Sequence, residues 1–402
     1  MKRRFNTITG LLLMLVISAC SLTAQQTGST SPAAPTKAPA ASIGQPAGAT
    51  AIPSAKTPLP TQPVPTLAVQ DVSSLPRLAD LPEGWSKIDP GGKTTCARGG
   101  TYSFSVRKTN SNKLLIYFEG GGTCYDAASC RQGGGVFDDS IDYEFVADNP
   151  ALKSDGVFAF SNPLNPFKDY NVIFINYCTG DAYLGAKTAE YTYDGYTYSV
   201  QHMGFENARM VMEWTYKNFE KPESLFMIGC SAGVIGSYMQ SPYILEHYKG
   251  VPTVLIGDSG GPYIDGPAVL FSNFGVENLF ASWIPSYDQL ISDGSVHSSM
   301  FLTIPAQTYP TVKFGLLDTT GDAVQTTLLS TFQPNLSLSA SIDANLKKVR
   351  ADAPNFLSYT GPGDYHCITM NPAFYGYRVN NIRLDDWFAR LAAGQTVENV
   401  SP

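Results

Sequence analysis

Residues 225–233 read Leu-Phe-Met-Ile-Gly-Cys-Ser-Ala-Gly, a short apolar run that ends in a G-x-S-x-G motif. The apolar run predicts a buried strand, and the helix-compatible stretch Val234–His247 follows the motif. With 36 glycines in the chain, the motif can arise by chance, so the strand before it and the helix after it decide whether it marks a nucleophile. Strand, tight turn and helix form the arrangement that exposes a serine hydroxyl at the edge of a sheet. Ser231 is therefore the first candidate nucleophile.

Similar apolar runs recur on both sides of this stretch. The predicted strands are Lys113–Phe118, Asn171–Tyr177, Leu225–Ile228, Thr253–Ile256, Thr311–Leu317 and Phe356–Tyr359. The amphipathic stretch Met203–Phe219 predicts a helix between two of them. Near-continuous apolar strands separated by helices are typical of a parallel sheet that is covered on both faces. The sequence predicts an α/β fold with one mostly parallel sheet, flanked by helices, in a single catalytic domain.

A second G-x-S-x-G match occupies Gly257-Asp-Ser-Gly-Gly-Pro262. It resembles the signature of trypsin-like proteases, but no upstream Ala-Ala-His-Cys segment accompanies it. Pro262, Gly266 and Pro267 also prevent a helix from following. We therefore expect Ser259 on a loop at the carboxyl end of a strand, where it could line the pocket.

Length, charge and hydropathy limit the class of protein. The chain has 402 residues, with 27 Lys and Arg against 34 Asp and Glu, a formal net charge of −7. A nucleic-acid binder would need a basic face to replace phosphate counterions, so no nucleic-acid partner is expected. A single long apolar run excludes a membrane protein with several spans.

The N-terminal segment has the pattern of an export signal. A positive stretch at residues 2–4 precedes the apolar run Leu11–Ile17, which is too short to span a bilayer. Ile17-Ser-Ala-Cys20 resembles the bacterial lipobox, in which the cysteine thiol is lipidated. We expect residues 1–20 to be a lipoprotein signal peptide, with Cys20 lipidated and the protein extracytoplasmic, either anchored to the cell envelope or secreted. An ordinary signal peptide is the alternative.

Residues 21–80 are rich in Pro, Ala, Ser and Thr. Such a segment buries too little apolar surface to offset its ordering entropy. The sequence predicts a disordered tether over residues 21–80 and a catalytic domain over residues 81–402.

Six cysteines remain beyond Cys20: Cys96, Cys124, Cys130, Cys178, Cys230 and Cys367. An even number outside the cytoplasm predicts disulfides, and fifteen pairings are possible. The chain has no CxxC pair and no histidine cluster beside the cysteines, so neither a metal site nor a cofactor is expected.

A serine nucleophile needs a base, and the chain has four histidines: His202, His247, His297 and His366. In an α/β hydrolase the order is serine, acid, histidine, with the histidine after the last strand. His366 follows the strand Phe356–Tyr359 and a Gly-Pro-Gly loop, so it is the candidate base. His297 ranks a distant second because it precedes the Thr311–Leu317 strand.

Three aspartates are candidates for the acid. Asp318 and Asp322 both follow the strand Thr311–Leu317, and Asp258 follows the strand before it. Spacing leaves this choice open.

Cysteines flank both the nucleophile and the base. Cys230 directly precedes Ser231, and Cys367 directly follows His366. If the two cysteines pair, the disulfide holds nucleophile and base at a fixed separation. A similar arrangement is seen in tannases and feruloyl esterases.

An oxyanion needs preorganised N–H donors. Ala232, directly after the nucleophile, supplies one candidate. The loop Glu119-Gly-Gly-Gly122 follows an early strand, where the second donor of such enzymes lies. A plain turn is the alternative for this loop.

Seven segments together resemble the pectin acetylesterase/Notum carboxylesterases. They are Thr95–Gly99, Tyr117–Cys124, Asn176–Asp181, Gly229–Gly233, Gly257–Gly260, Asp322–Gln325 and His366. The resemblance implies an α/β-hydrolase-like fold and ester hydrolysis by a Ser-Asp-His triad. It assigns the nucleophile to Ser231, the acid to Asp322 and the base to His366.

The resemblance also implies an oxyanion hole and a set of disulfides. The oxyanion hole would comprise Gly121, Gly122 and Ala232. The bridges would be Cys96–Cys178 and Cys124–Cys130, which leaves Cys230 and Cys367 for each other. Plant and animal members usually have a tryptophan where this chain has Gly122 and Thr123, so substrate shape is expected to differ.

Taken together, the sequence predicts a secreted, lipid-anchored serine carboxylesterase. The expected partners are a membrane, through the lipid, and an acylated carbohydrate or another small ester. Acetyl esters on a plant cell-wall polysaccharide such as pectin are the first choice. The acidic chain offers no evident basic groove for a polyanion, so small acyl esters stay open. The rival class is a non-catalytic glycan-binding lipoprotein that uses the Tyr-rich stretch Tyr191–Tyr198.

Overall fold

The structure is a computed structural model that describes residues 67–134, 136–141, 154–260, 273–275 and 299–402. The chain divides into two units, Met1–Thr57 and Pro58–Pro402, and every described residue lies in the second. The predicted signal peptide, Cys20 and His297 lie outside the described residues.

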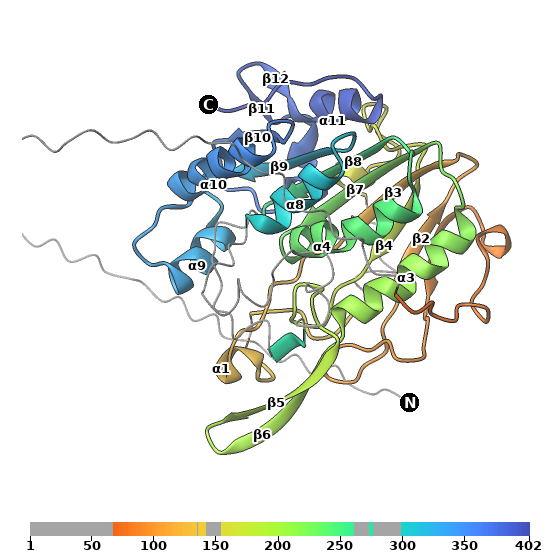
Figure 1. The fold of residues 1–402 in the computed structure, drawn as a ribbon, viewed down its shortest axis with the longest axis vertical. Coiled ribbons are helices and arrows are strands. Elements are labelled where there is room, and N and C mark those ends of the chain that lie inside the picture. Colours follow the sequence, from red (N-terminus) through yellow and green to blue (C-terminus); the bar gives the residue numbers. More distant parts are fainter. Residues whose placement is uncertain (1–66, 135, 142–153, 261–272, 276–298) are drawn as a thin grey trace, which may run out of the picture. The chain divides into compact units, whose positions relative to one another are not determined.

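An eight-stranded sheet forms the centre of the second unit, in the order β1-β2-β4-β3-β7-β8-β9-β10 (Figure 1). Its strands are β1 (Gly84–Ile88), β2 (Phe104–Lys108), β3 (Lys113–Phe118), β4 (Asn171–Ile175), β7 (Ser224–Cys230), β8 (Thr253–Asp258), β9 (Lys313–Thr319) and β10 (Leu357–Gly361). The six strands from β4 to β10 in this order pair in parallel, whereas β2 is antiparallel to both of its neighbours. The prediction of an α/β-hydrolase-like, mostly parallel sheet is confirmed.

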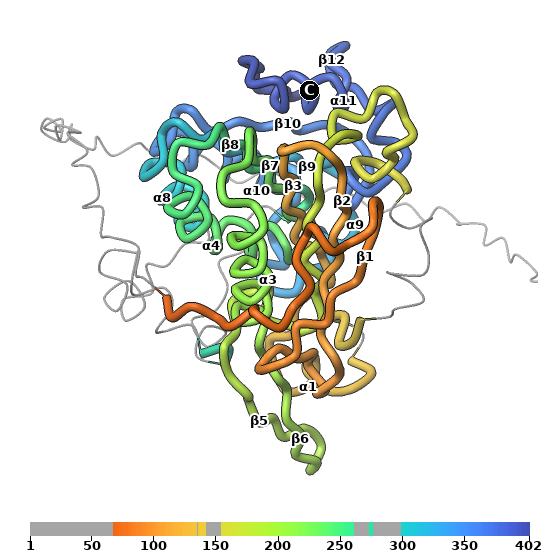
Figure 2. Tube along the Cα trace, turned by 90° about the vertical axis from the view of Figure 1, so that its right-hand side faces the viewer, coloured from red at the N-terminus to blue at the C-terminus, as the bar shows by residue number. Residues whose placement is uncertain are grey.

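Helices cover both faces of this sheet. The first face carries α3 (Gly204–Asn218), α4 (Ala232–His247), α8 (Met300–Thr308), α9 (Ala323–Phe332) and α10 (Leu338–Asp352). The second face carries η2 (Gly156–Phe158), η3 (Ile368–Met370), η4 (Pro372–Tyr375) and α11 (Leu384–Ala392). Figure 2 shows α3, α4 and α8 together on one side of the strands.

Strand β3 explains why the central runs are apolar at every position. Leu114, Ile116 and Phe118 pack into the buried cluster under the first face. Leu115 and Tyr117 point the other way and pack into the cluster under the second face. Successive side chains of a strand alternate between faces, so a strand covered on both sides must be apolar throughout.

The N-terminal boundary of the packed unit differs from the prediction. The predicted tether ended at residue 80, but Val72 is only 4% exposed and lies in the core. The Trp214 indole donates to the Pro76 carbonyl at 2.7 Å, and the Leu78 N–H donates to the Asn218 side chain at 2.7 Å. The prediction was based on the average composition of the segment. A few apolar side chains in it, among them Val72, are enough to pack the segment against α3.

A hairpin outside the main sheet was not predicted. It comprises β5 (Lys187–Tyr193) and β6 (Tyr196–His202), and Figure 1 shows it extending past α1 (Ala127–Cys130). Its turn residues Asp194 and Gly195 have φ of 51° and 81°. This is the Asp-Gly turn that favours a tight hairpin. The remaining elements are η1 (Leu78–Asp80), β11 (Arg378–Val379) and β12 (Ile382–Arg383).

Within the described ranges, no helix has the length and apolar character needed to cross a membrane.

Candidate active site

Ser231 stands on a strained turn between β7 and α4. Its φ of 52° and ψ of −120° lie in a region that non-glycine residues rarely adopt, so the surrounding structure must hold it there. The Ser231 N–H donates to the Asp258 carbonyl at 2.8 Å. A Cβ on Gly233 would lie 2.2 Å from the Phe118 carbonyl oxygen, so only glycine lets α4 pack this closely. Steric crowding therefore explains why the second glycine of the G-x-S-x-G motif must be a glycine.

His366 and Asp322 meet at 2.7 Å between Nδ1 and Oδ2. Asp322 is fully buried and is also the N-cap of α9. Its Oδ1 accepts from the N–H groups of Val324 and Gln325 at 2.9 and 3.0 Å, which leaves Oδ2 for the imidazole. With the Nδ1 proton directed at this carboxylate, Nε2 is free to take a proton from a nucleophile.

A disulfide joins the turn of Ser231 to the loop of His366. Cys230 and Cys367 are bonded, with their Cα atoms 5.5 Å apart. Both residues are described, and the Ser231 hydroxyl makes no hydrogen bond to His366, whose imidazole contacts Asp322. Catalytic hydrogen bonds are often open in the free enzyme and tighten in the substrate complex.

The other two disulfides link Cys96 to Cys178 and Cys124 to Cys130, the pairs that the family resemblance implied.

Ser259 lies where it was expected, at the carboxyl end of a strand, but its side chain is buried. It follows β8, as predicted, but is only 2% exposed. Its hydroxyl donates to Asp258 Oδ1 at 3.0 Å and accepts from the Cys367 N–H at 2.9 Å. This hydroxyl is committed to a buried network.

The two remaining candidate acids do not contact the imidazole. Asp318 lies within β9 and accepts from the Gln325 amide at 3.2 Å. Burial, with the nearby charges of Asp258 and Asp322, raises the pKa of Asp318 well above its usual value. Asp258 accepts from the N–H and hydroxyl of Thr369. Of the three aspartates, only Asp322 contacts the imidazole of His366.

The glycine loop lies directly against the nucleophile turn. A Cβ on Gly120 would be 3.0 Å from both Ser231 Cβ and Cys230 Sγ. Gly121 and Gly122 have φ of 143° and 72°, a backbone that favours glycine. Ala232, the other predicted donor, begins α4, where the helix itself leaves the first N–H groups unpaired. The three predicted oxyanion donors thus come from two segments that meet at Ser231.

Tyr183 supports this loop and was missed at the sequence level. Its hydroxyl lies 2.9 Å from the carbonyls of both Glu119 and Ile175, so it spans the glycine loop and the end of β4. Only its position two residues after Asp181, at the end of a segment shared with the family, could have pointed to it.

Two of the other histidines have structural environments. The Nε2 of His202 lies 2.9 Å from the Tyr191 hydroxyl, and its Nδ1 lies 3.0 Å from the Thr179 carbonyl oxygen. Burial lowers the pKa of His202. His247 stacks on Tyr216 with ring centroids 3.8 Å apart.

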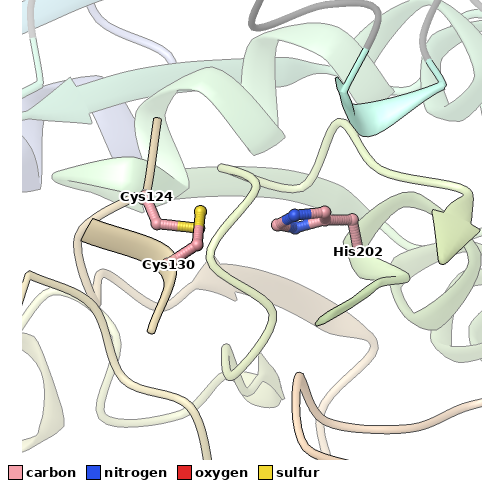
Figure 3. Close-up of side chains that lie close together, drawn as sticks. All are labelled: Cys124, Cys130 and His202. Carbon is pink, nitrogen blue, oxygen red and sulfur yellow. A yellow bond between two sulfur atoms is a disulfide. The ribbon is translucent and has the colours of Figure 1, made fainter. Parts of the chain in front are cut away.

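His202 also lies beside Cys124 and Cys130, and the three ligand atoms fall within 4.8 Å of one another (Figure 3). The two sulfurs form a disulfide, so they offer no thiolate to a metal.

Known proteins show similarity to this chain over part of its length. Residues 91–292, half of the chain, match the family model Pectinacetylesterase. Pectin acetylesterase 5 of Arabidopsis thaliana is 27% identical over 164 residues, 40% of this chain and 37% of that protein. Palmitoleoyl-protein carboxylesterase notum2 of Xenopus laevis is 27% identical over 146 residues, 35% of this chain and 28% of that protein.

The aligned part thus spans less than two-fifths of either relative. Among solved structures, the Wnt deacylase Notum from Drosophila matches with a TM-score of 0.49 at 18% identity, over 76% of this chain and 93% of that one. The family model includes Ser231 and the glycine loop but ends before Asp322 and His366, whose positions rest on geometry. This chain belongs to the pectinacetylesterase family.

Proposed function

We propose that this protein is a secreted serine carboxylesterase that hydrolyses acyl esters through Ser231, Asp322 and His366. The observation that carries the proposal is the contact of 2.7 Å between Asp322 Oδ2 and His366 Nδ1. The disulfide Cys230–Cys367 joins the loop of His366 to the turn of Ser231. Capping of α9 explains one carboxylate oxygen of Asp322, but it does not explain why the other faces a histidine whose loop is bonded to the Ser231 turn at the carboxyl edge of a parallel sheet. That edge is where α/β enzymes hold their catalytic groups.

The chemistry follows from the roles of the three side chains. The Ser231 hydroxyl attacks the ester carbonyl while His366 Nε2 takes its proton, and Asp322 stabilises the resulting imidazolium. The backbone N–H groups of Gly121, Gly122 and Ala232 would stabilise the oxyanion. His366 then returns the proton to the leaving alcohol, which leaves an acyl-enzyme. Water, deprotonated by the same histidine, releases the carboxylic acid and restores the serine.

We further propose an acetylated plant cell-wall polysaccharide, such as pectin, as substrate. The names of the plant relatives support this choice, whereas the animal relatives are named for a palmitoleoyl ester on protein. Because the net charge of −7 disfavours a strongly anionic polymer, we expect pectin with few free carboxylates, or another sparsely charged acetylated glycan, to be preferred. Acetate release from a panel of acetylated polysaccharides, against a series of p-nitrophenyl esters of rising chain length, tests the substrate.

The decisive test of the activity compares Ser231→Ala with the wild-type protein on p-nitrophenyl acetate. We expect turnover to fall by about 10⁴-fold or more, because the attacking atom is removed. Equal rates in both proteins would end the esterase proposal and leave the glycan-binding alternative. The exposed Tyr193 and Tyr196 of the hairpin, 41% and 78% exposed, are the surface on which that alternative would rest.

We also propose that Cys20 is lipidated and that the Pro-, Ala-, Ser- and Thr-rich segment after it, up to the packed stretch that includes Val72, is a tether. The support is the sequence pattern and composition of this segment. The Cys20→Ser variant should move from the membrane fraction to the soluble fraction, and mass spectrometry should find no diacylglyceryl group on it. A wild-type protein without a lipid would contradict the anchor.

A further inference from the structure

Asp258 and Ser259 are buried polar residues that the catalytic scheme leaves unused. They are 0% and 2% exposed and lie at the end of β8, in the second G-x-S-x-G motif. Burying a carboxylate and a hydroxyl is costly unless both are hydrogen-bonded. The partners that they have acquired are therefore informative.

Their backbone joins the strands of the nucleophile and the acid. The Asp258 carbonyl accepts from the Ser231 N–H at 2.8 Å, and the Ser259 N–H donates to the Leu317 carbonyl of β9 at 2.9 Å. Asp322 follows β9 by three residues. This short stretch thus contacts both the residue proposed to attack and the strand that carries its acid.

Their side chains hold the loop that carries the base. Asp258 Oδ2 accepts from the Thr369 N–H at 2.8 Å and from the Thr369 hydroxyl at 2.6 Å. The Ser259 hydroxyl accepts from the Cys367 N–H at 2.9 Å while it donates to Asp258 Oδ1. The residues held are the first and the third after His366.

The conformation of this loop requires such support. Cys367 has φ of +56°, in the left-handed region that is unfavourable for a side chain. A strained residue persists only when its surroundings hold it. The hydrogen bond from its N–H to Ser259 and its disulfide to Cys230 supply that restraint from two directions.

We propose that Asp258 and Ser259 are positioning residues that set the imidazole of His366 relative to the hydroxyl of Ser231. This inference rests on the proposed function. The disulfide fixes only the separation of two backbones, and the loop can still rotate about it. The hydrogen bonds to residues 367 and 369 remove that rotation. A small misplacement of a base costs far more in rate than in binding.

The experiment measures kcat, KM and melting temperature for Ser259→Ala, with p-nitrophenyl acetate as substrate. It also follows the rate at which a fluorophosphonate probe labels Ser231. We expect kcat and the labelling rate to fall together by about tenfold, with KM within about twofold, because only the alignment of the base is lost. Ser241→Ala is the matched control, because it also removes a buried hydroxyl, one that donates within α4 to the Tyr238 carbonyl. It should leave kcat and labelling unchanged.

A second pair of variants covers the case in which Ser259→Ala does not fold. Thr369→Val keeps the shape of the side chain but removes the hydroxyl that donates a hydrogen bond to Asp258. Thr369→Ser keeps that hydroxyl. We expect Thr369→Val to lose kcat by a similar factor and Thr369→Ser to recover most of it.

Three results would overturn the inference. The first is wild-type kcat and labelling in both Ser259→Ala and Thr369→Val, even with lowered melting temperatures. The second is equal loss in Thr369→Val and Thr369→Ser. The third is a fluorophosphonate adduct on Ser259 instead of Ser231 in the wild-type protein, which would make Ser259 the nucleophile. None of these resembles the failure of the proposed function, which is unchanged turnover in Ser231→Ala.

Discussion

Single residues at this site serve structure and chemistry together. Asp322 caps α9 with one carboxylate oxygen and holds His366 with the other. Gly120 leaves space for the turn of Ser231, and Ser231, which is partly buried, has a strained backbone conformation. Substitutions that remove one role and keep the other can therefore separate catalysis from stability.

Asp322→Asn is the sharpest of these substitutions. Asparagine caps helices as well as aspartate, so the melting temperature should stay close to that of the wild type. The amide cannot stabilise an imidazolium and favours the wrong tautomer of His366, so kcat should fall by about 10⁴-fold. Asp322→Ala is the control, which should lose the same activity and about 1 kcal/mol of stability in addition. Activity above a tenth of wild type in Asp322→Asn would exclude it as the acid.

Gly120→Ala tests the placement of the glycine loop. The new methyl group would lie 3.0 Å from Ser231 Cβ, so the loop must move away from the nucleophile. We expect kcat to fall by about 10²-fold, the loss typical of one displaced oxyanion donor. Gly100→Ala is the control, because its Cβ would meet only Cys96 Cβ, at 3.9 Å. Similar kcat values for the two variants would argue against an oxyanion role for the loop.

At the level of elements, two segments outside the main sheet pack against its surrounding helices. Residues 68–80 cover part of α3, and the β5–β6 hairpin packs against α1 through Tyr198, whose hydroxyl donates to the Ala127 carbonyl. The same hairpin carries His202 into a buried position beside Asp181, which is also buried. Both segments contribute buried polar contacts whose energetic effects can be measured.

Truncation should locate the true start of the packed unit. A chain that begins at Leu67 keeps the buried Val72 and the Pro76 carbonyl to which the Trp214 indole donates. It should have the melting temperature of the full-length protein. A chain that begins at Leu81 exposes apolar surface and leaves the indole N–H without its partner, which together cost about 3 kcal/mol. Thermal unfolding followed by circular dichroism compares them, and identical melting temperatures would restore the boundary at residue 80.

His202 should make stability depend on pH. Burial lowers its pKa in the folded protein, whereas the unfolded chain protonates it near about 6.5. The unfolded state therefore binds more protons below that pH, and stability falls as the pH drops from about 6.5 toward the folded-state pKa. In this pH window, the free energy of unfolding measured with urea should depend less steeply on pH in His202→Gln than in the wild type. Parallel slopes would mean that the imidazole does not carry the effect.

Across the whole molecule, three disulfides link the loops around the sheet. They fit a location outside the reducing cytoplasm. Cys230–Cys367 closes a sequence separation of 137 residues, whereas Cys124–Cys130 closes only 6. The first connects the turn of Ser231 to the loop of His366, and the second closes a short turn after the glycine loop.

The two bridges should differ in their effect on stability. In the chain-entropy description, the long bridge stabilises by about 5 kcal/mol and the short one by about 2 kcal/mol. Cys230→Ala/Cys367→Ala should therefore lower the melting temperature more than Cys124→Ala/Cys130→Ala. Only the first pair should also reduce kcat strongly, because it frees the loop of His366. A larger destabilisation from the short bridge would contradict this ranking.

Several features could be predicted from local patterns alone. The strands around β7 and the helix after Ser231 follow from apolar periodicity and glycine spacing, which are properties of contiguous residues, and chain order makes His366 the candidate base. Each predicted strand matches an observed one to within about two residues, because continuous apolar runs have few alternatives to a covered sheet.

Other features depend on which segments pack together. Spacing along the chain did not separate Asp258, Asp318 and Asp322, and the family resemblance alone favoured Asp322. The folded loop of residue 366 brings the imidazole to Asp322 and not to the other two carboxylates. The same packing turns Ser259 inward and draws residues 68–80 onto α3. Hydrogen-bond partners more than a hundred residues apart leave no periodic trace along the chain, because they are set by the close approach of surfaces that form only when the sheet and its helices assemble.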